Sequence, residues 1–179
     1  QNATYRLTTS NVKLDTLDAF KGLQIRTMEN PIHMAAFQVM GADPTPMAFG
    51  ELFTALQQGT IDGHDNSLGT INSGNVQEVQ KYISATNHIA DAWIVGMNTN
   101  KLNGLTENQQ NALHQAAEEC QQWYVDYQAE KDGEMLKLLT DNGMEYNEVP
   151  EEDFQEFVSV SQELYPKFKE MVQNDELFD

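Results

Sequence analysis

Apolar residues recur at helical spacing in two stretches of the segment 22–66, and each stretch lies between two short extended runs. The first stretch follows Asn30 and Pro31, a pair suited to the N-cap and the first position of a helix. Gly41 and Gly59 follow the two stretches and can adopt the left-handed conformation that ends many helices. The pattern predicts strand–helix–strand–helix–strand, a unit that builds parallel sheets with right-handed crossovers.

The rest of the chain predicts further strands and two long helical segments. Thr106 and Gln109 form a capping box, which opens a helical pattern that continues to about Asn142. At 1.5 Å per residue this helix would extend roughly 50 Å, more than the width of one small domain, so we expect it to bridge two lobes. Strands are predicted at 3–10, 81–86, 90–98 (buried on both faces) and 144–149, and a helix broken at Pro166 is predicted at 151–172.

Two polar residues fall near the carboxyl ends of the predicted parallel strands, where open α/β sheets bind their ligands. These residues are Arg26 and Asn66. Arg26 also lies just before a helix N-terminus, whose free amides and dipole favour anions. A guanidinium in that position predicts recognition of a carboxylate or a phosphate.

The amino-acid composition excludes some classes of binding partner and of site. The chain has 28 acidic and 10 basic residues and a net charge of −18, which argues against binding to nucleic acid or to an anionic membrane surface. Its two arginines, Arg6 and Arg26, both fall in predicted strands. Cys120 is the single cysteine, which excludes an intrachain disulfide and a cysteine metal cluster. Because Cys120 shares a helical stripe with Leu113 and Trp123, we expect it to be a buried thiol.

Four motifs, at 25–31 (IRTMENP), 41–52 (GADPTPMAFGEL), 55–63 (ALQQGTIDG) and 78–88 (EVQKYISATNH), resemble the extracytoplasmic solute-binding subunits of TRAP transporters. These transporters are tripartite, ATP-independent carriers of organic acid anions. The resemblance extends from about Arg6 to the C-terminal helices. It implies periplasmic capture of a small carboxylate, without catalysis or a cofactor, and delivery to small and large integral membrane subunits.

The resemblance also implies a two-lobed α/β fold of the periplasmic-binding-protein type, of which this chain would be mainly the second lobe. Residues 1–91 and 132–179 would form that lobe. Residues 92–131 would return to the first lobe and include the start of the bridging helix. Family members are longer, so the resemblance implies that the signal peptide and an N-terminal half are absent from this chain.

Several residues match positions at which the family contacts its ligand. The resemblance assigns Arg26 as the clamp on the substrate carboxylate, with Arg6 and Asn66 completing the polar contacts. Phe49 would pack on the carbon skeleton of the ligand, although its helical spacing also allows a core position. Glu29 stands where several relatives have asparagine, so it would select a hydroxyl or ammonium group. Trp93 is a further candidate for the wall of the cleft.

Two other functions remain open at this stage. Asp62, His64 and Asp65 could belong to a metal-assisted hydrolase, although no further histidine or glutamate stands at a recognised spacing and we expect no metal. The same architecture could also serve as the ligand-binding domain of a sensor. In the motif around Asn66, relatives usually show Gln-Glu where this chain has His64 and Asp65.

Overall fold

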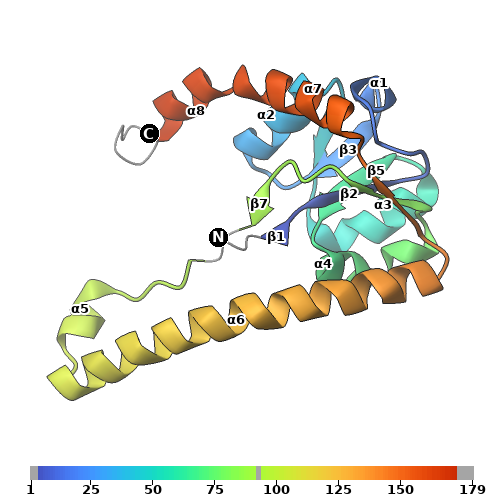
Figure 1. Cartoon of the computed structure of the whole chain (residues 1–179). Helices are drawn as coiled ribbons and strands as arrows, with labels where there is room; N and C mark the ends of the chain where they lie inside the picture. The colour runs from blue at the N-terminus through green and yellow to red at the C-terminus, as the bar shows by residue number, and fades with distance from the viewer. Residues whose placement is uncertain (1–3, 92–93, 173–179) are drawn as a thin grey trace.

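A six-stranded sheet forms the centre of the protein, in a computed structural model that describes residues 4–91 and 94–172 (Figure 1). Its strands, in sheet order, are β4 (Asp43–Pro46), β3 (Gln24–Thr27), β5 (Gly63–Asn66), β2 (Leu7–Ser10), β6 (Tyr82–Ala85) and β8 (Glu145–Glu148). β3 pairs in parallel with β4 and β5, β2 pairs antiparallel with β5 and β6, and β6 pairs in parallel with β8. All of these strands except β2 therefore run in one direction, and their carboxyl ends lie at the same edge of the sheet.

The predicted strand–helix unit is confirmed. It consists of β3, α2 (Pro31–Val39), β4, α3 (Leu52–Gln58) and β5, with a short 3₁₀ helix, η1 (Phe49–Glu51), before α3. The side chain of Asn30 accepts hydrogen bonds from the amides of Ile32 and His33, which caps α2. Gly41 and Gly59 have φ values of 93° and 68°, so both take the left-handed conformation expected after a helix.

Helices cover both faces of the sheet and create two separate apolar cores. One core lies under α3 and α4 (Leu68–Ser73) and continues to the base of the long helix α6 (Glu107–Asp141); its members include Leu7, Leu52, Leu56, Ile71, Ile83 and Leu139. The other core is covered by α1 (Leu17–Phe20), α2 and α7 (Glu151–Gln162), and it includes Leu14, Phe20, Ile25, Phe37 and Phe157. Aromatic packing is specific there, since the Phe20 and Phe157 rings meet edge to face at 5.7 Å.

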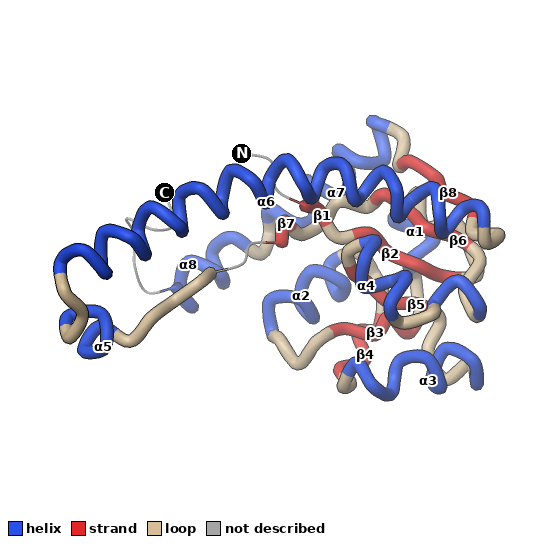
Figure 2. Tube along the Cα trace, turned by 90° about the horizontal axis from the view of Figure 1, so that it is seen from below, coloured by secondary structure: helices blue, strands red, loops and turns tan. Residues whose placement is uncertain are grey.

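The remaining elements extend from this body. α6 begins with the predicted capping box, in which Thr106 and Gln109 satisfy each other's backbone amides. Figure 2 shows α6 passing the sheet and reaching α5 (Thr99–Asn103) at its far end. The other elements are the 3₁₀ helix η2 (Val76–Glu78), the strand pair β1 (Thr4–Tyr5) and β7 (Ala90–Asp91), and α8 (Tyr165–Val172), which follows a break after α7.

Three predictions about burial were wrong. Within the described part of the apolar run 90–98, which lacks residues 92–93, a strand is present only at Ala90–Asp91, and Ile94 and Val95 are 95% and 99% exposed. Cys120 is exposed, and its neighbours on the helical stripe are exposed too, because this part of α6 projects beyond the sheet. The apolar spacing of the predicted helix 151–172 also places Met171 on its inward face, yet Met171 is 44% exposed. The three errors have the same cause. Apolar periodicity shows that a face is suited to burial, but it does not show that another part of the same chain packs against that face.

Candidate functional site

Arg26 lies in β3 near the carboxyl edge of the sheet, and its side chain is held from the neighbouring loop. Its Nε and Nη2 donate to the carbonyl oxygen of Met47 at 3.0 and 2.8 Å. Met47 is placed there because β4 pairs in register with β3 and the Met47 amide donates to the Thr27 carbonyl. Only 3% of Arg26 is exposed. Burial lowers the pKa of the guanidinium and the charge of Asp65 opposes that shift; an arginine nevertheless stays protonated in proteins.

Phe49 packs beside this guanidinium. Its ring centroid lies 6.0 Å from the Arg26 Cζ, within the range of a cation–π contact. The ring is 41% exposed, whereas Leu52 and Leu56, which follow it at helical spacing, are buried. Of the two positions open for Phe49, the structure therefore gives it an exposed one next to Arg26 rather than one in the core.

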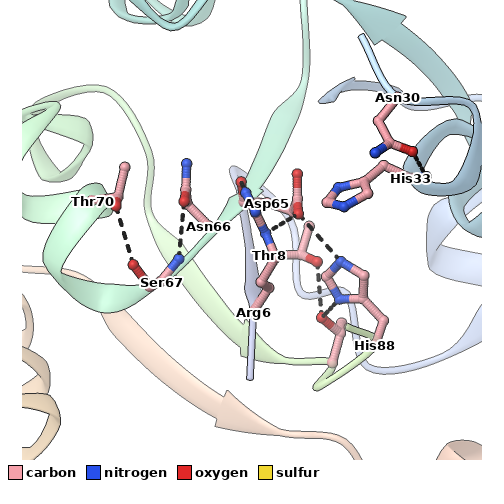
Figure 3. A network of polar contacts seen from close by, with 10 residues as sticks. Arg6, Thr8, Asn30, His33, Asp65, Asn66, Ser67, Thr70 and His88 are labelled. Carbon is pink, nitrogen blue, oxygen red and sulfur yellow. Dashed lines mark hydrogen bonds and ion pairs between the residues drawn. The ribbon is translucent and has the colours of Figure 1, made fainter. Parts of the chain in front are cut away.

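Arg6 forms a second buried site with Asp65 and His88 (Figure 3). Arg6 lies between β1 and β2, and its Nε is 2.6 Å from Asp65 Oδ2 while its Nη2 donates to the Asp65 carbonyl at 3.1 Å. His88 Nε2 lies 3.5 Å from the same carboxylate oxygen, and the hydroxyls of Thr86 and Thr8 continue the chain of contacts from His88 Nδ1. The carboxylate is completely buried, so its charge depends on these partners.

These contacts hold Asp65 in its ionised form. Burial by itself raises the pKa of the carboxyl, but the hydrogen bond and charge of His88 and the charge of Arg6 outweigh it and lower the pKa to about 2. The charge of Arg6 is correspondingly neutralised inside the protein. Arg6 was predicted to contact the ligand directly, and nothing in these contacts tests that prediction.

The two arginines lie on opposite faces of the sheet. Arg26 pairs in register with His64, whose side chain shares the α3 face, while Arg6 contacts Asp65, the next residue along β5. Successive side chains of a strand point to opposite faces, so the two sites approach each other only at the strand edge. Figure 3 shows Asn66 beyond Asp65 at that edge, with its oxygen accepting from the Ser67 amide at 3.2 Å.

His64 is a fully buried histidine whose ring contacts a neighbouring hydroxyl. It is 0% exposed, and its Nδ1 lies 2.7 Å from the hydroxyl of Thr9. Burial chiefly lowers its pKa to about 4; Asp65 opposes the shift, and the charges of Arg26 and Arg6 add to it. Asp62 accepts a hydrogen bond from the Gln24 amide instead. Within residues 4–91 and 94–172 no three His, Cys, Asp or Glu side chains are grouped closely enough to hold a metal, so the hydrolase hypothesis finds no centre there.

The other predicted site residues are less informative. Glu29 is exposed just before α2, and Trp93 lies outside the described residues. His88 is the residue of this site that no sequence pattern indicated. Its partner Asp65 is 23 positions away, and no local pattern signals that pairing; only the rule that a buried carboxylate needs a counter-charge hinted at it.

Comparison with known proteins decides the family. The profile described as "Bacterial extracellular solute-binding protein, family 7" matches residues 1–171. The chain belongs to this family. Among curated relatives of this solute-binding family, the 2,3-diketo-L-gulonate-binding periplasmic protein YiaO of Escherichia coli is 34% identical over 81% of the chain and 44% of its own length.

Solved structures of TRAP periplasmic solute-binding proteins share the fold. One from Sulfitobacter sp. NAS-14.1, with bound β-D-galacturonate, has a TM-score of 0.83 and 28% identity, covering 96% of this chain and 58% of that one. The ectoine-binding protein of the TeaABC TRAP transporter of Halomonas elongata has a TM-score of 0.85 and 28% identity, covering 98% and 58%. The predicted α/β class is thus confirmed, and the chain spans about half the length of these relatives. No helix in the described residues is both long and apolar enough to cross a membrane.

Proposed function

We propose that this chain is the second lobe of a periplasmic solute-binding protein, which captures a small organic acid anion and delivers it to the membrane subunits of a TRAP transporter. The observation that carries the proposal is Arg26. It is a nearly buried guanidinium at the carboxyl edge of a parallel sheet, in a chain whose net charge is −18. Its Nε and Nη2 donate to the carbonyl oxygen of Met47, and Nη1 would bind a carboxylate oxygen of the ligand.

The contacts around Arg26 support a ligand with both charge and apolar surface. Phe49 offers an exposed ring face beside the guanidinium, suited to the carbon skeleton of an acid. Asn66 presents an amide at the same edge, and an amide can both donate to and accept from an oxygen ligand. Arg6 contributes through its pair with Asp65, and Glu29 and Trp93 would adjust selectivity at the rim of the site. Relatives named for diketogulonate, galacturonate and ectoine binding set the size of the expected ligand.

We further propose that residues 1–91 and 132–179 belong to the second lobe and that residues 92–131 pack on a first lobe. The exposure of Ile94, Val95 and Trp123 supports this division, since soluble proteins rarely leave neighbouring large apolar side chains uncovered. The greater length of the relatives supplies the amount of chain needed to cover them. Binding would then close the two lobes on the anion, as hinge motions do in two-lobed binders.

The test is calorimetry of the full-length protein with succinate, D-galacturonate and related acids, for the wild type and for Arg26→Ala. Removing one partner of a buried charge pair costs about 2–5 kcal/mol, which is about 30- to several-thousand-fold in Kd. Lys21→Ala is the control, because Lys21 pairs with Asp18 on the exposed surface and its loss should leave Kd unchanged. A Kd for Arg26→Ala equal to that of the control would remove Arg26 from the binding site.

A further inference from the structure

Gly74 occupies a position at which a side chain would meet the ring of Phe49. It follows α4, and a Cβ built on it would lie 3.2 Å from Phe49 Cζ, 3.3 Å from the Thr70 carbonyl oxygen and 3.4 Å from Val76 Cγ2. These distances are shorter than a relaxed contact between carbon atoms. The backbone of Gly74 is ordinary, with φ −85° and ψ 2°. Space, and not backbone conformation, is therefore what a glycine provides at this position.

Phe49 connects this position to the candidate anion site. One part of its environment is the Arg26 guanidinium, 6.0 Å from the ring centroid, and the end of the ring, Cζ, reaches Gly74. Phe49 comes two residues after Met47, whose carbonyl oxygen holds Arg26. The end of α4, the ring and the guanidinium are thus linked by direct contacts, from Gly74 through Phe49 to Arg26.

The ring is the neighbour that can yield to an added methyl group. It is 41% exposed and turns about its own side-chain bonds, whereas Thr70 accepts through a backbone carbonyl fixed by the hydrogen bond from the Gly74 amide. An alanine at position 74 would therefore displace the ring by a few tenths of an ångström away from Gly74. Because the ring centroid lies 6.0 Å from the Arg26 Cζ, this displacement changes the shape of the space beside the guanidinium.

We propose that Gly74 is a positioning residue that sets the depth of the Phe49 ring and thereby determines how large a carbon skeleton fits beside Arg26. The inference rests on the proposed binding of an organic acid anion. It makes the packing at the end of α4 a determinant of ligand selectivity, although Gly74 itself has no side chain with which to contact a ligand. Larger acids lose affinity first when the ring moves, because they fill more of the space next to it.

Gly74→Ala tests the proposal, and Gly69→Ala, within α4, is its control. A Cβ at Gly69 would meet nothing within 4 Å, so both variants add one methyl group, in α4 or directly after it, but only Gly74→Ala meets the ring. In the full-length protein we expect Gly74→Ala to weaken D-galacturonate binding by about fivefold or more, the low end of what overpacking costs, and succinate binding by less. Gly69→Ala should leave both Kd values and their ratio unchanged.

Repeating the substitution in a Phe49→Leu protein separates the effect of the ring from the effects of the other neighbours of Gly74. Phe49→Leu removes Cζ, so adding Gly74→Ala to Phe49→Leu should cost no further affinity. An equal loss in both backgrounds would assign the effect to Thr70 or Val76 and overturn the proposal, as would a Gly74→Ala protein that binds like Gly69→Ala. Thermal unfolding of each variant verifies that it is folded.

A readout without ligand distinguishes this inference from the proposed function. The NMR resonances of the Phe49 ring in the free protein should shift in Gly74→Ala and stay in place in Gly69→Ala. If the ring shifts but the wild type binds no carboxylate, the proposed function and the selectivity role both fail, while the contact between Gly74 and Phe49 stands. If the wild type binds and Arg26→Ala does not, but the ring resonances are the same in both glycine variants, only this inference fails.

Discussion

Polar and apolar side chains are distributed in opposite ways in two regions of the molecule. One is the sheet domain, meaning the six-stranded sheet with its covering helices, and the other is the region of residues 94–131 that projects beyond it. In the sheet domain Arg6, Arg26 and Asp65 are 4%, 3% and 0% exposed, while beyond it Val95 and Trp123 are 99% and 58% exposed. Globular proteins usually bury the second kind of residue and expose the first. Each of these buried charges has a partner within the sheet domain: Arg6 pairs with Asp65, and Arg26 donates to the Met47 carbonyl oxygen. The projecting region has apolar surface without cover, and it is there that we expect the first lobe to dock.

The largest loss of stability is expected when the buried Arg6–Asp65 pair is broken. Arg6→Ala leaves the Asp65 carboxylate buried without its closest counter-charge, and breaking such a pair costs about 3–5 kcal/mol of unfolding free energy. Urea unfolding at neutral pH measures this loss.

Lys137→Ala is the control for that experiment, because Lys137 and Asp141 form a pair at an equally short distance with both side chains exposed. It should leave the unfolding midpoint unchanged, since exposed pairs contribute little. Equal midpoints for Arg6→Ala and Lys137→Ala would mean that the Asp65 carboxylate does not depend on Arg6.

His64 gives the buried site a distinct dependence on pH. Its pKa is about 4 in the folded protein and about 6.5 in the unfolded chain. At a pH between these values, the unfolded chain binds a proton at His64 and the folded protein does not. Stability is therefore unaffected above pH 6.5 and falls as the pH drops toward 4, by about 3 kcal/mol in total at 1.36 kcal/mol per unit. His64→Gln should remove this dependence.

Urea unfolding of the wild type and of His64→Gln from pH 7.5 to pH 4.5 measures the effect as a difference between the two proteins. Asp65 does not interfere, because its folded pKa of about 2 lies below its ordinary value of 3.8, so its contribution is present above 3.8 and lost only below that pH. Parallel pH profiles for the two proteins would show that His64 takes up protons freely in the folded state.

For the chain of 179 residues, the smallest effect is expected on the projecting helix. Trp123 stacks on Tyr127 at 4.7 Å with the ring planes 19° apart, but it is 58% exposed. Trp123→Ala in the chain of 179 residues should therefore change the unfolding free energy by no more than about 0.5 kcal/mol, as is usual for surface positions. In the full-length protein the same change should cost about 3–5 kcal/mol, because there we expect the first lobe to bury the ring. Chemical unfolding of both proteins gives the two values, and equal values would mean that this face stays uncovered.

Local sequence signals predicted local structure well. Asn30 with Pro31, the two helix-ending glycines and the capping box at Thr106 each specify a backbone conformation through atoms within a few residues, and each occurs as predicted. The order of the sheet was only partly accessible. The parallel unit followed from its repeating pattern, but the antiparallel insertion of β2 between β5 and β6 depends on contacts between distant segments.

The site was harder to predict for the same reason. Arg26 could be found because a strand end followed by a helix N-terminus marks a probable anion position, whereas its attachment to the Met47 carbonyl depends on the register between β3 and β4. The contact between His88 and Asp65 joins the loop after β6 to strand β5, and no sequence pattern relates these two segments. Burial of the stripe around Cys120 was predicted wrongly, since periodicity carries no information about which surface provides the cover.

The length of α6 has a mechanical consequence. Its 35 residues form one continuous rod about 50 Å long, and among the described residues it joins the apolar core near its C-terminal end, at Leu139, Met135 and Leu136. For a lever of that length, a tilt of one degree at the anchored end displaces the opposite end by about 1 Å. A tilt of a few degrees, caused by repacking of side chains around Leu139 and Met135, would therefore move α5 by a few ångströms. Anything bound at that end of the helix would move with it.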